Sequence, residues 1–285
     1  MPNIVNKNFT RDHIITPDQS VAFRISDDLE KWPWLALPPS HAIVAQMVNY
    51  FCSVEAGRAR GNLDTEKWTA LTSTSWWCGS TSRNAPHGAH GVVDRVGEAD
   101  DSPDYKLTVF NGAGGLVYRM AGRGVVFRNR DFEGWREKAK TEIAALPEPA
   151  DFRFADREAA CVATKAEVCV SPAFEEGDAR AVDALFTAHS GFGGHPFHGG
   201  SGDHVNSGHQ ADAVQQAAQL LFGAAGAPLA IKGGEAKFKR YVELDRPFRI
   251  ALNGEKSAPG RPVFDLSQGG HPCSRFSLTL SEGDG

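Results

Sequence analysis

Residues 189–216 bring together side chains that can exchange protons near neutral pH. The segment is rich in glycine, which lets a backbone approach a ligand closely. Histidine titrates close to neutral pH, and burial can hold an aspartate partly protonated. This combination is typical of a site for general acid–base catalysis. The titratable residues of the segment are five of the ten histidines and two aspartates, namely His189, His195, His198, Asp203, His204, His209 and Asp212.

A helix is predicted directly after this loop, from His209 to a glycine-containing stop. Its apolar residues fall on one side of a helical wheel, and a polar row spaced i, i+3, i+7 and i+10 falls on the other. Gln216 follows Asp212 by one turn in this row, so its amide can orient the Asp212 carboxyl. A solvated polar face is the alternative to a functional one. The polar row consists of His209, Asp212, Gln216 and Gln219.

The start of this helix offers backbone groups that could bind an anion. Asn206 and Ser207 are plausible N-caps, because their short polar side chains can accept from the first amides. The amides of Gly208, His209 and Gln210 are predicted to point free N–H groups outward at the positive end of the helix dipole. Such a terminus suits a developing oxyanion, for example the enolate of a thioester.

The elements that must position these residues occur twice along the chain. The segment ALPEPAD at 145–151 has the two prolines typical of a linker. Each half has strand-like runs, one long helix and a diglycine turn between strands. We therefore predict an α+β chain of two similar units, 1–145 and 152–285, with two unrelated α+β domains as the alternative. The strand-like runs are Gln19–Ile25, Trp68–Trp77, Tyr105–Phe110, Cys161–Val170, Ala236–Val242, Phe248–Leu252 and Pro262–Leu266.

The two predicted long helices differ in a way that assigns chemistry to the second. The first begins at His41 and is apolar nearly all round, as expected for a buried helix. Placing His41 on His209 puts Val44 at the position of Asp212. The first copy therefore has no acid at this position, and His41 is the only histidine near the start of its helix. We expect the first copy to be structural and the second to carry the site.

Composition excludes several classes of function. The formal net charge is −5 and the pI is about 6.1, so no basic surplus favours nucleic acid or an anionic membrane. No membrane-length apolar stretch and no signal peptide are recognised, which indicates a cytoplasmic protein. Five widely spaced cysteines without a CxxC pair indicate reduced thiols rather than disulfides or structural zinc.

A metal site is the rival explanation for the histidine cluster. Imidazole and carboxylate ligands are present in the strings HPFH and GDH and at Asp212. The spacings match no tight ligand motif such as HExxH, so we predict neither a metal nor another cofactor.

The string Asp212-Ala213-Val214-Gln215-Gln216 resembles the EAxxQ or DAxxQ motif of fatty-acid and polyketide dehydratases. The longer string Asp203–Ala218 also resembles hotdog proteins of A-factor biosynthesis. In the hotdog fold a curled antiparallel sheet wraps one long helix. Together with the two-copy organisation, the resemblance implies a double hotdog.

The resemblance also implies an activity. It implies dehydration or hydration of a 3-hydroxyacyl thioester carried on coenzyme A or an acyl carrier protein. The alternatives are thioester hydrolysis, acyl transfer of the A-factor-synthase kind, and a non-catalytic module that binds an acyl chain or small ligand. A homodimer is possible. The implied catalytic residues are Asp212, Gln216 and a histidine, with His198 and His204 fitting two different registers and His41 lying in the other copy. The implied oxyanion and substrate contacts are Asn206, Gly208 and His209.

Overall fold

The computed structural model describes residues 8–61, 69–96, 104–126, 132–147, 151–162, 167–177, 179–187, 204–224 and 226–281. These residues form two compact units. The first unit contains every described element up to residue 126, together with the strand residues Ile231–Ala236. The second unit contains the elements from residue 132 onward, except that strand segment.

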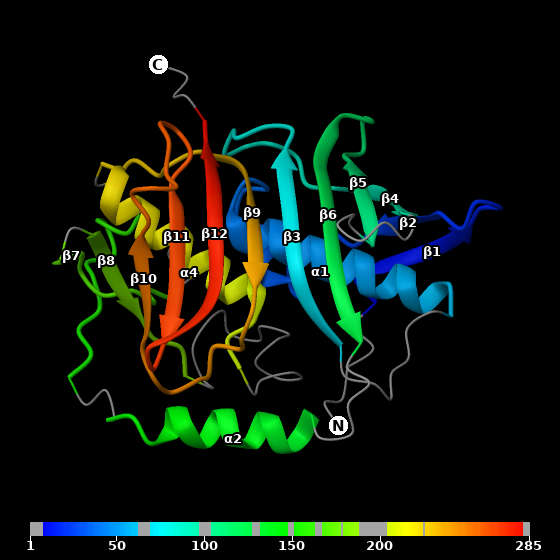
Figure 1. Ribbon diagram of the computed structural model, residues 1–285. Helices are drawn as coiled ribbons and strands as arrows, with labels where there is room; N and C mark the ends of the chain where they lie inside the picture. Colours follow the sequence, from blue (N-terminus) through cyan, green and yellow to red (C-terminus); the bar gives the residue numbers. More distant parts are fainter. Residues whose placement is uncertain are drawn as a thin grey trace. The chain divides into compact units, whose positions relative to one another are not determined.

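The first unit is an antiparallel sheet packed against one long helix. Its strands lie in the order β1-β2-β4-β5-β6-β3, followed by β9 beside β3. Figure 1 shows α1 lying across one face of this sheet. The elements are β1 (Thr10–Ile15), β2 (Val21–Ile25), η1 (Pro33–Ala36), α1 (Ala42–Ala59), β3 (Thr69–Cys78), β4 (His90–Arg95), β5 (Tyr105–Phe110), β6 (Leu116–Val126) and β9 (Ile231–Phe238).

Helix α1 is buried on nearly all sides, as its apolar sequence predicts. Ile43, Val44 and Met47 are almost completely removed from solvent. Glu55 is also buried in this helix, and both of its carboxylate oxygens are hydrogen-bonded, because they accept from the backbone N–H groups of Phe9 and Thr10. These bonds fix the start of β1 to the helix.

The second unit repeats this arrangement around α4. Its strands lie in the order β12-β11-β10-β8-β7, and Figure 1 shows α4 behind β10, β11 and β12. Gly269 and Gly270 form the β11–β12 turn with positive φ angles of 58° and 78°, which confirms the predicted diglycine hairpin. The elements are α2 (Phe132–Ala144), β7 (Phe174–Glu176), β8 (Ala179–Ala184), α4 (Ser207–Phe222), β10 (Phe248–Leu252), β11 (Val263–Gln268) and β12 (His271–Leu280).

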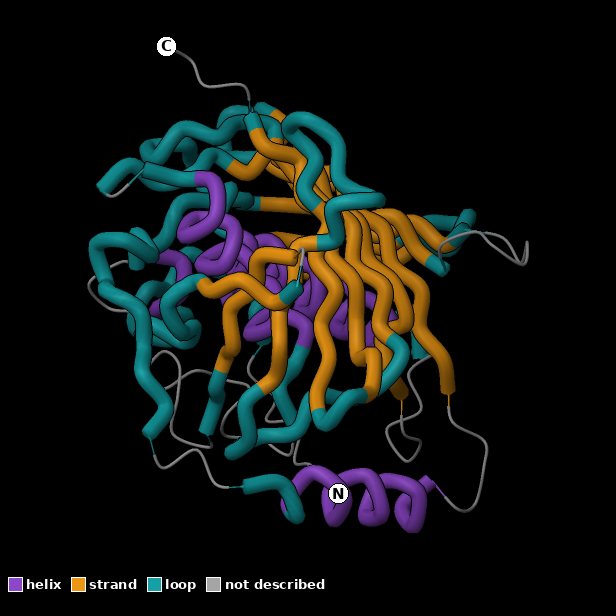
Figure 2. The backbone as a smooth tube through the Cα atoms, turned by 60° about the vertical axis from the view of Figure 1, so that its left-hand side comes forward, coloured by secondary structure: helices purple, strands orange, loops and turns teal. Residues whose placement is uncertain are grey.

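Helix α2 lies at the ends of the strands of the second unit rather than on a face of the sheet, as Figures 1 and 2 both show. A buried ion pair joins Arg136 of α2 to Glu243, which precedes β10. Arg246 donates to the carbonyl oxygens of Ala144 and Leu146 at the end of the helix. Although α2 precedes the segment 145–151, its contacts place it in the second unit. The domain limits at 145 and 152 stay a prediction.

Two predicted strands are wrong in part. In the described parts of Cys161–Val170, only Val170 makes a β contact, an isolated bridge to Ala184. Strand β9 starts at Ile231 rather than at Ala236. Gly233 lies within this strand, and a Cβ atom there would stand 2.4 Å from the carbonyl oxygen of Trp76.

Candidate functional site

The first turn of α4 is closed by a side chain of the chain itself. Asn206 is the N-cap, as predicted, and its Oδ1 accepts from the N–H groups of Gly208 at 3.0 Å and His209 at 3.2 Å. The N–H of Gln210 donates to the carbonyl oxygen of Asn206. The expectation that these three amides are free for an oxyanion is therefore wrong, because the cap satisfies them.

Backbone and side-chain bonds fix this end of α4 to the sheet of its unit. Val205 donates its N–H to the carbonyl oxygen of Val242 at 2.7 Å. Gln210 donates to the carbonyl oxygen of Val205, and its Oε1 accepts from the hydroxyl of Ser274 on β12. The position of the first turn, and hence of Asp212, is set by this frame.

Asp212 is a buried carboxyl group with a strongly raised pKa. The residue is 8% exposed and is one of the buried residues of α4. Burial raises the pKa of Asp212 from 3.8 to about 7, and the hydrogen bond from Gln216 opposes part of this rise. Near neutral pH the carboxyl can therefore donate or accept a proton.

Gln216 holds the Asp212 carboxyl through a fixed amide. Its Oε1 accepts from the backbone N–H of Cys169 at 3.0 Å, and its Nε2 donates to the carbonyl oxygen of Glu167 at 3.1 Å. The same Nε2 lies 3.4 Å from Oδ2 of Asp212. The backbone around residues 167–169 thus decides which end of the amide faces the acid, and the predicted pairing of Asp212 with Gln216 is present.

The rest of the polar row on α4 is also buried rather than solvated. His209 is 1% exposed, and its ring lies 5.0 Å from that of Phe186. Gln219 donates to the carbonyl oxygens of Ala224 and Ala227 and accepts from the N–H of Leu229, so it fastens the chain after the helix. Within this row, the hydrogen bond from the Gln216 amide orients the titratable carboxyl group of Asp212.

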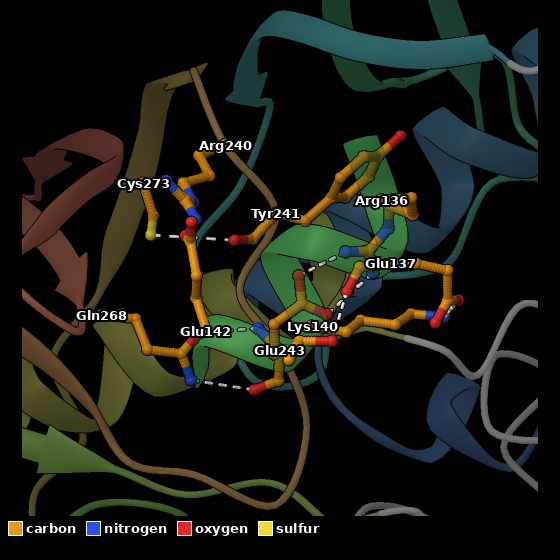
Figure 3. A network of polar contacts seen from close by, with 10 residues as sticks. Arg136, Glu137, Lys140, Glu142, Arg240, Tyr241, Glu243, Gln268 and Cys273 are labelled. Atoms are coloured by element: carbon orange, nitrogen blue, oxygen red, sulfur yellow. Dashed lines mark hydrogen bonds and ion pairs between the residues drawn. The ribbon is translucent and has the colours of Figure 1, made fainter. Parts of the chain in front are cut away.

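His204 lies at an aromatic and ionic cluster. Its ring is 4.5 Å from the ring of Tyr241, and the Arg136 guanidinium lies 4.5 Å from the same ring. Figure 3 shows Tyr241 beside Arg136 and the paired Glu243. Gln268 completes the cluster, because its amide accepts from the N–H of Glu243 and donates to the Glu243 carbonyl oxygen.

His41 caps α1 in the first unit. Its Nδ1 accepts from the N–H of Ile43 at 3.4 Å, and burial lowers the pKa of His41 to about 4, so the ring is neutral at pH 7. Val44, the counterpart of Asp212 in the first copy, is fully buried. The third histidine candidate, His198, lies outside the described residues, as do His189, His195 and Asp203.

The described part of the chain also bears on the expectations for metal ligands, membrane helices and cysteines. There, no group of three or more histidine, cysteine, aspartate or glutamate side chains is arranged to hold a metal ion. Among the described helices, none combines the length and hydrophobicity required for a membrane span. All five cysteines are free thiols, and Cys161 is the least buried of them.

Two parts of this arrangement were missed from the sequence. The hydrogen bond from the Cys169 N–H to Gln216 could not be predicted, because the pattern of residues 161–170 is typical of a strand, whose amides bond to a neighbouring strand. The pairing of Arg136 with Glu243 spans 107 positions and follows no local spacing rule.

Comparison with known proteins identifies the fold. No protein-family model matches the chain, and no curated protein matches it. Among solved structures, a putative oleoyl thioesterase from Lactobacillus plantarum is similar, with a TM-score of 0.52 and 12% identity. The match covers 92% of this chain and 96% of that one, and so includes both helix-and-sheet units. The chain has the double-hotdog fold.

Further double-hotdog structures are similar at lower scores. The 12:0-ACP thioesterase from Umbellularia californica gives a TM-score of 0.49 at 10% identity, covering 92% of this chain and 96% of that one. The erythromycin dehydratase gives 0.47 at 15% identity, covering 96% and 95%. The fold assignment rests on the L. plantarum structure, whose 12% identity makes the likeness one of fold alone, and it confirms the α+β double hotdog expected from the sequence.

Proposed function

We propose that this double-hotdog protein is an enzyme of acyl thioesters and that Asp212 is its titratable catalytic group. The observation that carries the proposal is the buried Asp212 carboxyl, with a pKa of about 7 and an amide that orients it. A titratable group poised near neutral pH is what proton transfer requires. The double-hotdog fold, shared with a protein described as a putative oleoyl thioesterase, supports the thioester class.

The leading reaction is reversible dehydration of a 3-hydroxyacyl thioester. A histidine, His198 or His204, takes the proton from the α-carbon, and protonated Asp212 gives its proton to the leaving 3-hydroxyl group. The α C–H bond and the C3–O bond break, a carbon–carbon double bond forms, and water leaves. The raised pKa supports the donor role, because a large part of Asp212 is protonated at pH 7.

The Gln216 contact also suits this role. The amide donates to Oδ2 of Asp212, so the proton of the neutral acid is favoured on Oδ1, and Oδ1 is the atom that gives it to the substrate. A carboxyl group with a fixed hydrogen-bond donor is held in a constant direction. Gln216 therefore acts as a positioning residue, and Asp212 as the acid.

Thioester hydrolysis is the second candidate, and the L. plantarum structure is the observation that favours it. Ionised Asp212 would then take a proton from water, the water oxygen would attack the thioester carbonyl, and the C–S bond would break to give an acid and a thiol. The two reactions require opposite protonation states of the same carboxyl. Dehydration should decline as pH rises through about 7, and hydrolysis should increase over the same range.

One experiment separates these reactions. The protein is incubated with 3-hydroxyacyl-CoA and with saturated acyl-CoA of matched length, and the enoyl product and the free thiol are measured between pH 5 and 9. We expect enoyl thioester from the hydroxylated substrate, with loss of activity at high pH. Free thiol with the opposite pH dependence would favour hydrolysis. Acyl carrier protein loaded with the same groups tests the second carrier.

The matched control is Asp265→Asn, on β11. Asp265 pairs with Arg275 and is partly exposed on another element, so the same chemical change there should leave activity unaltered. Asp212→Asn is expected to lower activity by at least about a hundredfold, which is typical for loss of a general acid. Full activity in Asp212→Asn would overturn the assignment of Asp212 as the catalytic group. Absence of both activities in the wild-type protein would leave a module that binds an acyl group.

A further inference from the structure

Helix α1 carries polar side chains on one side although it is buried on nearly all sides. Gln46 and Asn49, three residues apart, are 2% and 1% exposed. Asn49 donates to the hydroxyl of Thr74 on β3 at 2.8 Å, and its Oδ1 accepts from the hydroxyl of Tyr105 on β5 at 3.2 Å. These bonds show that this side of α1 faces the inner surface of the sheet.

The Gln46 amide has no protein partner in this interior. Among the described residues, neither its Nε2 nor its Oε1 makes a hydrogen bond. An unbonded buried amide is costly, since the group has lost water and gained nothing in return. Asn49, one turn away in the same interior, has both ends of its amide bonded. The contrast points to a missing partner for Gln46.

Trp76 on β3 presents a second unbonded group toward the same interior. Trp76 is 3% exposed, and its Nε1–H has no acceptor within the described ranges. Trp76 lies two positions from Thr74 on the strand and therefore points to the same face. The register pairs Trp76 with Met120 on β6.

Gln46 and Trp76 lie at the same level along the helix and the strand. Tyr118 on β6 pairs with Cys78 on β3 in the sheet register. The Tyr118 hydroxyl donates to the carbonyl oxygen of Pro39, just before α1. Asn49 reaches Thr74, four residues earlier on β3. Helix and strand therefore run in opposite directions, and Gln46 falls between these two levels, beside that of Trp76.

The chemistry of these groups defines what would satisfy them. The Gln46 amide offers donors and one acceptor, and the Trp76 indole offers one donor. The bonded neighbours are neutral as well: burial raises the pKa of Tyr105 to about 12, so its hydroxyl stays protonated. A hydroxyl group can accept from Trp76 and donate to Gln46 at once, whereas a charged group would be buried without a counter-ion.

We propose that the interior of the first unit, between α1 and β3, binds a hydroxyl group on an otherwise apolar ligand through Gln46 and Trp76. This inference rests on the proposed function, and it defines the substrate class further: an acyl chain with a hydroxyl group beyond the reacting carbons. Within the described residues, two other buried indole N–H groups lack an acceptor, those of Trp32 and Trp34. They differ from Trp76 because they pack among the rings of Phe9 and Phe51.

A pair of free fatty acids tests the proposal without thioester chemistry. Ricinoleic and oleic acid differ by one hydroxyl group, and their binding to the protein is measured by titration calorimetry. We expect ricinoleate to bind at least about tenfold more tightly, because the site rejects the analogue that leaves its donors unbonded. Gln46→Met should reduce the preference to less than about twofold, whereas Asp212→Asn should retain it. No preference in the wild-type protein, or a preference that survives Gln46→Met, would overturn the proposal.

A stability measurement excludes an ordered water as the partner. Without ligand, Gln46→Met should unfold at the same urea concentration as the wild type or a higher one, because an unbonded amide is replaced by an apolar side chain. The matched control is Gln219→Met, which removes an amide with three hydrogen bonds and should lower the midpoint. If Gln46→Met lowers it as much as the control does, the amide already has a partner and the proposed site is wrong. Because neither measurement involves turnover, failure here is distinct from failure of the proposed enzymatic function.

Discussion

Gln216 donates to Asp212 because the backbone N–H of Cys169 holds the other end of the Gln216 amide. The two contacts, 3.0 Å to Cys169 and 3.4 Å to Asp212, leave the amide one favourable orientation. Reversing it would place the amide oxygen against the carboxylate and the NH₂ group against another N–H. The direction of this hydrogen bond, and its effect on the Asp212 pKa, is therefore fixed by main-chain geometry.

Asp212 should make stability depend on pH. Its folded pKa of about 7 exceeds the ordinary 3.8, so the folded protein binds an additional proton between these values. The stabilisation from this proton is complete below about pH 4 and is lost as pH rises through about 7. Asp212→Asn should remove this decline, which we expect to be on the order of a few kcal/mol. Urea unfolding of both proteins at several pH values measures it, and parallel profiles would contradict the raised pKa.

Gln216→Met should shift the pH dependence of activity upward. The lost hydrogen bond stabilises the Asp212 carboxylate, so its removal raises the pKa of Asp212 further, by up to about one unit. A dehydration that needs the protonated acid would then persist to higher pH, with a lower maximal rate because the acid is less well oriented. The pH profile of the maximal rate tests this. Gln219→Met, which leaves Asp212 untouched, should leave the midpoint in place.

The buried pair of Arg136 and Glu243 should be essential to the attachment of α2. Arg136→Met leaves the Glu243 carboxylate buried without its partner, and we expect a loss of about 3–5 kcal/mol. Arg136→Met combined with Glu243→Leu should recover much of this loss, because no unpaired charge remains. The free energy of unfolding in urea measures both. A double variant as unstable as the single one would show that the cost comes from packing and not from charge.

The Asn206 cap predicts graded effects on stability. Asn206→Ala removes the acceptor of two amides and should cost about 1 kcal/mol, whereas Asn206→Gly should cost only a few tenths. Thermal unfolding distinguishes them. Equal stability of the alanine variant and the wild type would mean that solvent replaces the cap without penalty.

The sequence predicted the parts of the site that depend on local spacing. Asp212 and Gln216 are four residues apart on a helix, and Asn206 is a cap residue before it, so each contact follows from helical geometry. The double use of helix and sheet was also predictable, because both diglycine turns and both long helices leave local signals.

The remaining features depend on residues far apart in the chain. Whether the amides at the start of α4 are open depends on the rotamer of Asn206, and burial of the polar row depends on the sheet that covers it. The unbonded Gln46 amide could not be predicted at all, since its sequence environment resembles that of the fully bonded Asn49. Such contacts are set by tertiary packing, which periodicity does not report.

Strand β9 prevents a clean separation of the chain into its N-terminal and C-terminal halves. The first unit takes Ile231–Ala236 from the C-terminal half, and this strand lies beside β3. A cut within residues 145–151 would leave an N-terminal fragment whose β3 edge is open, with the Trp76 carbonyl oxygen no longer against Gly233. The two halves resemble one another, but the N-terminal half alone lacks one strand of its sheet. A peptide that contains β9 would have to be added to complete that sheet.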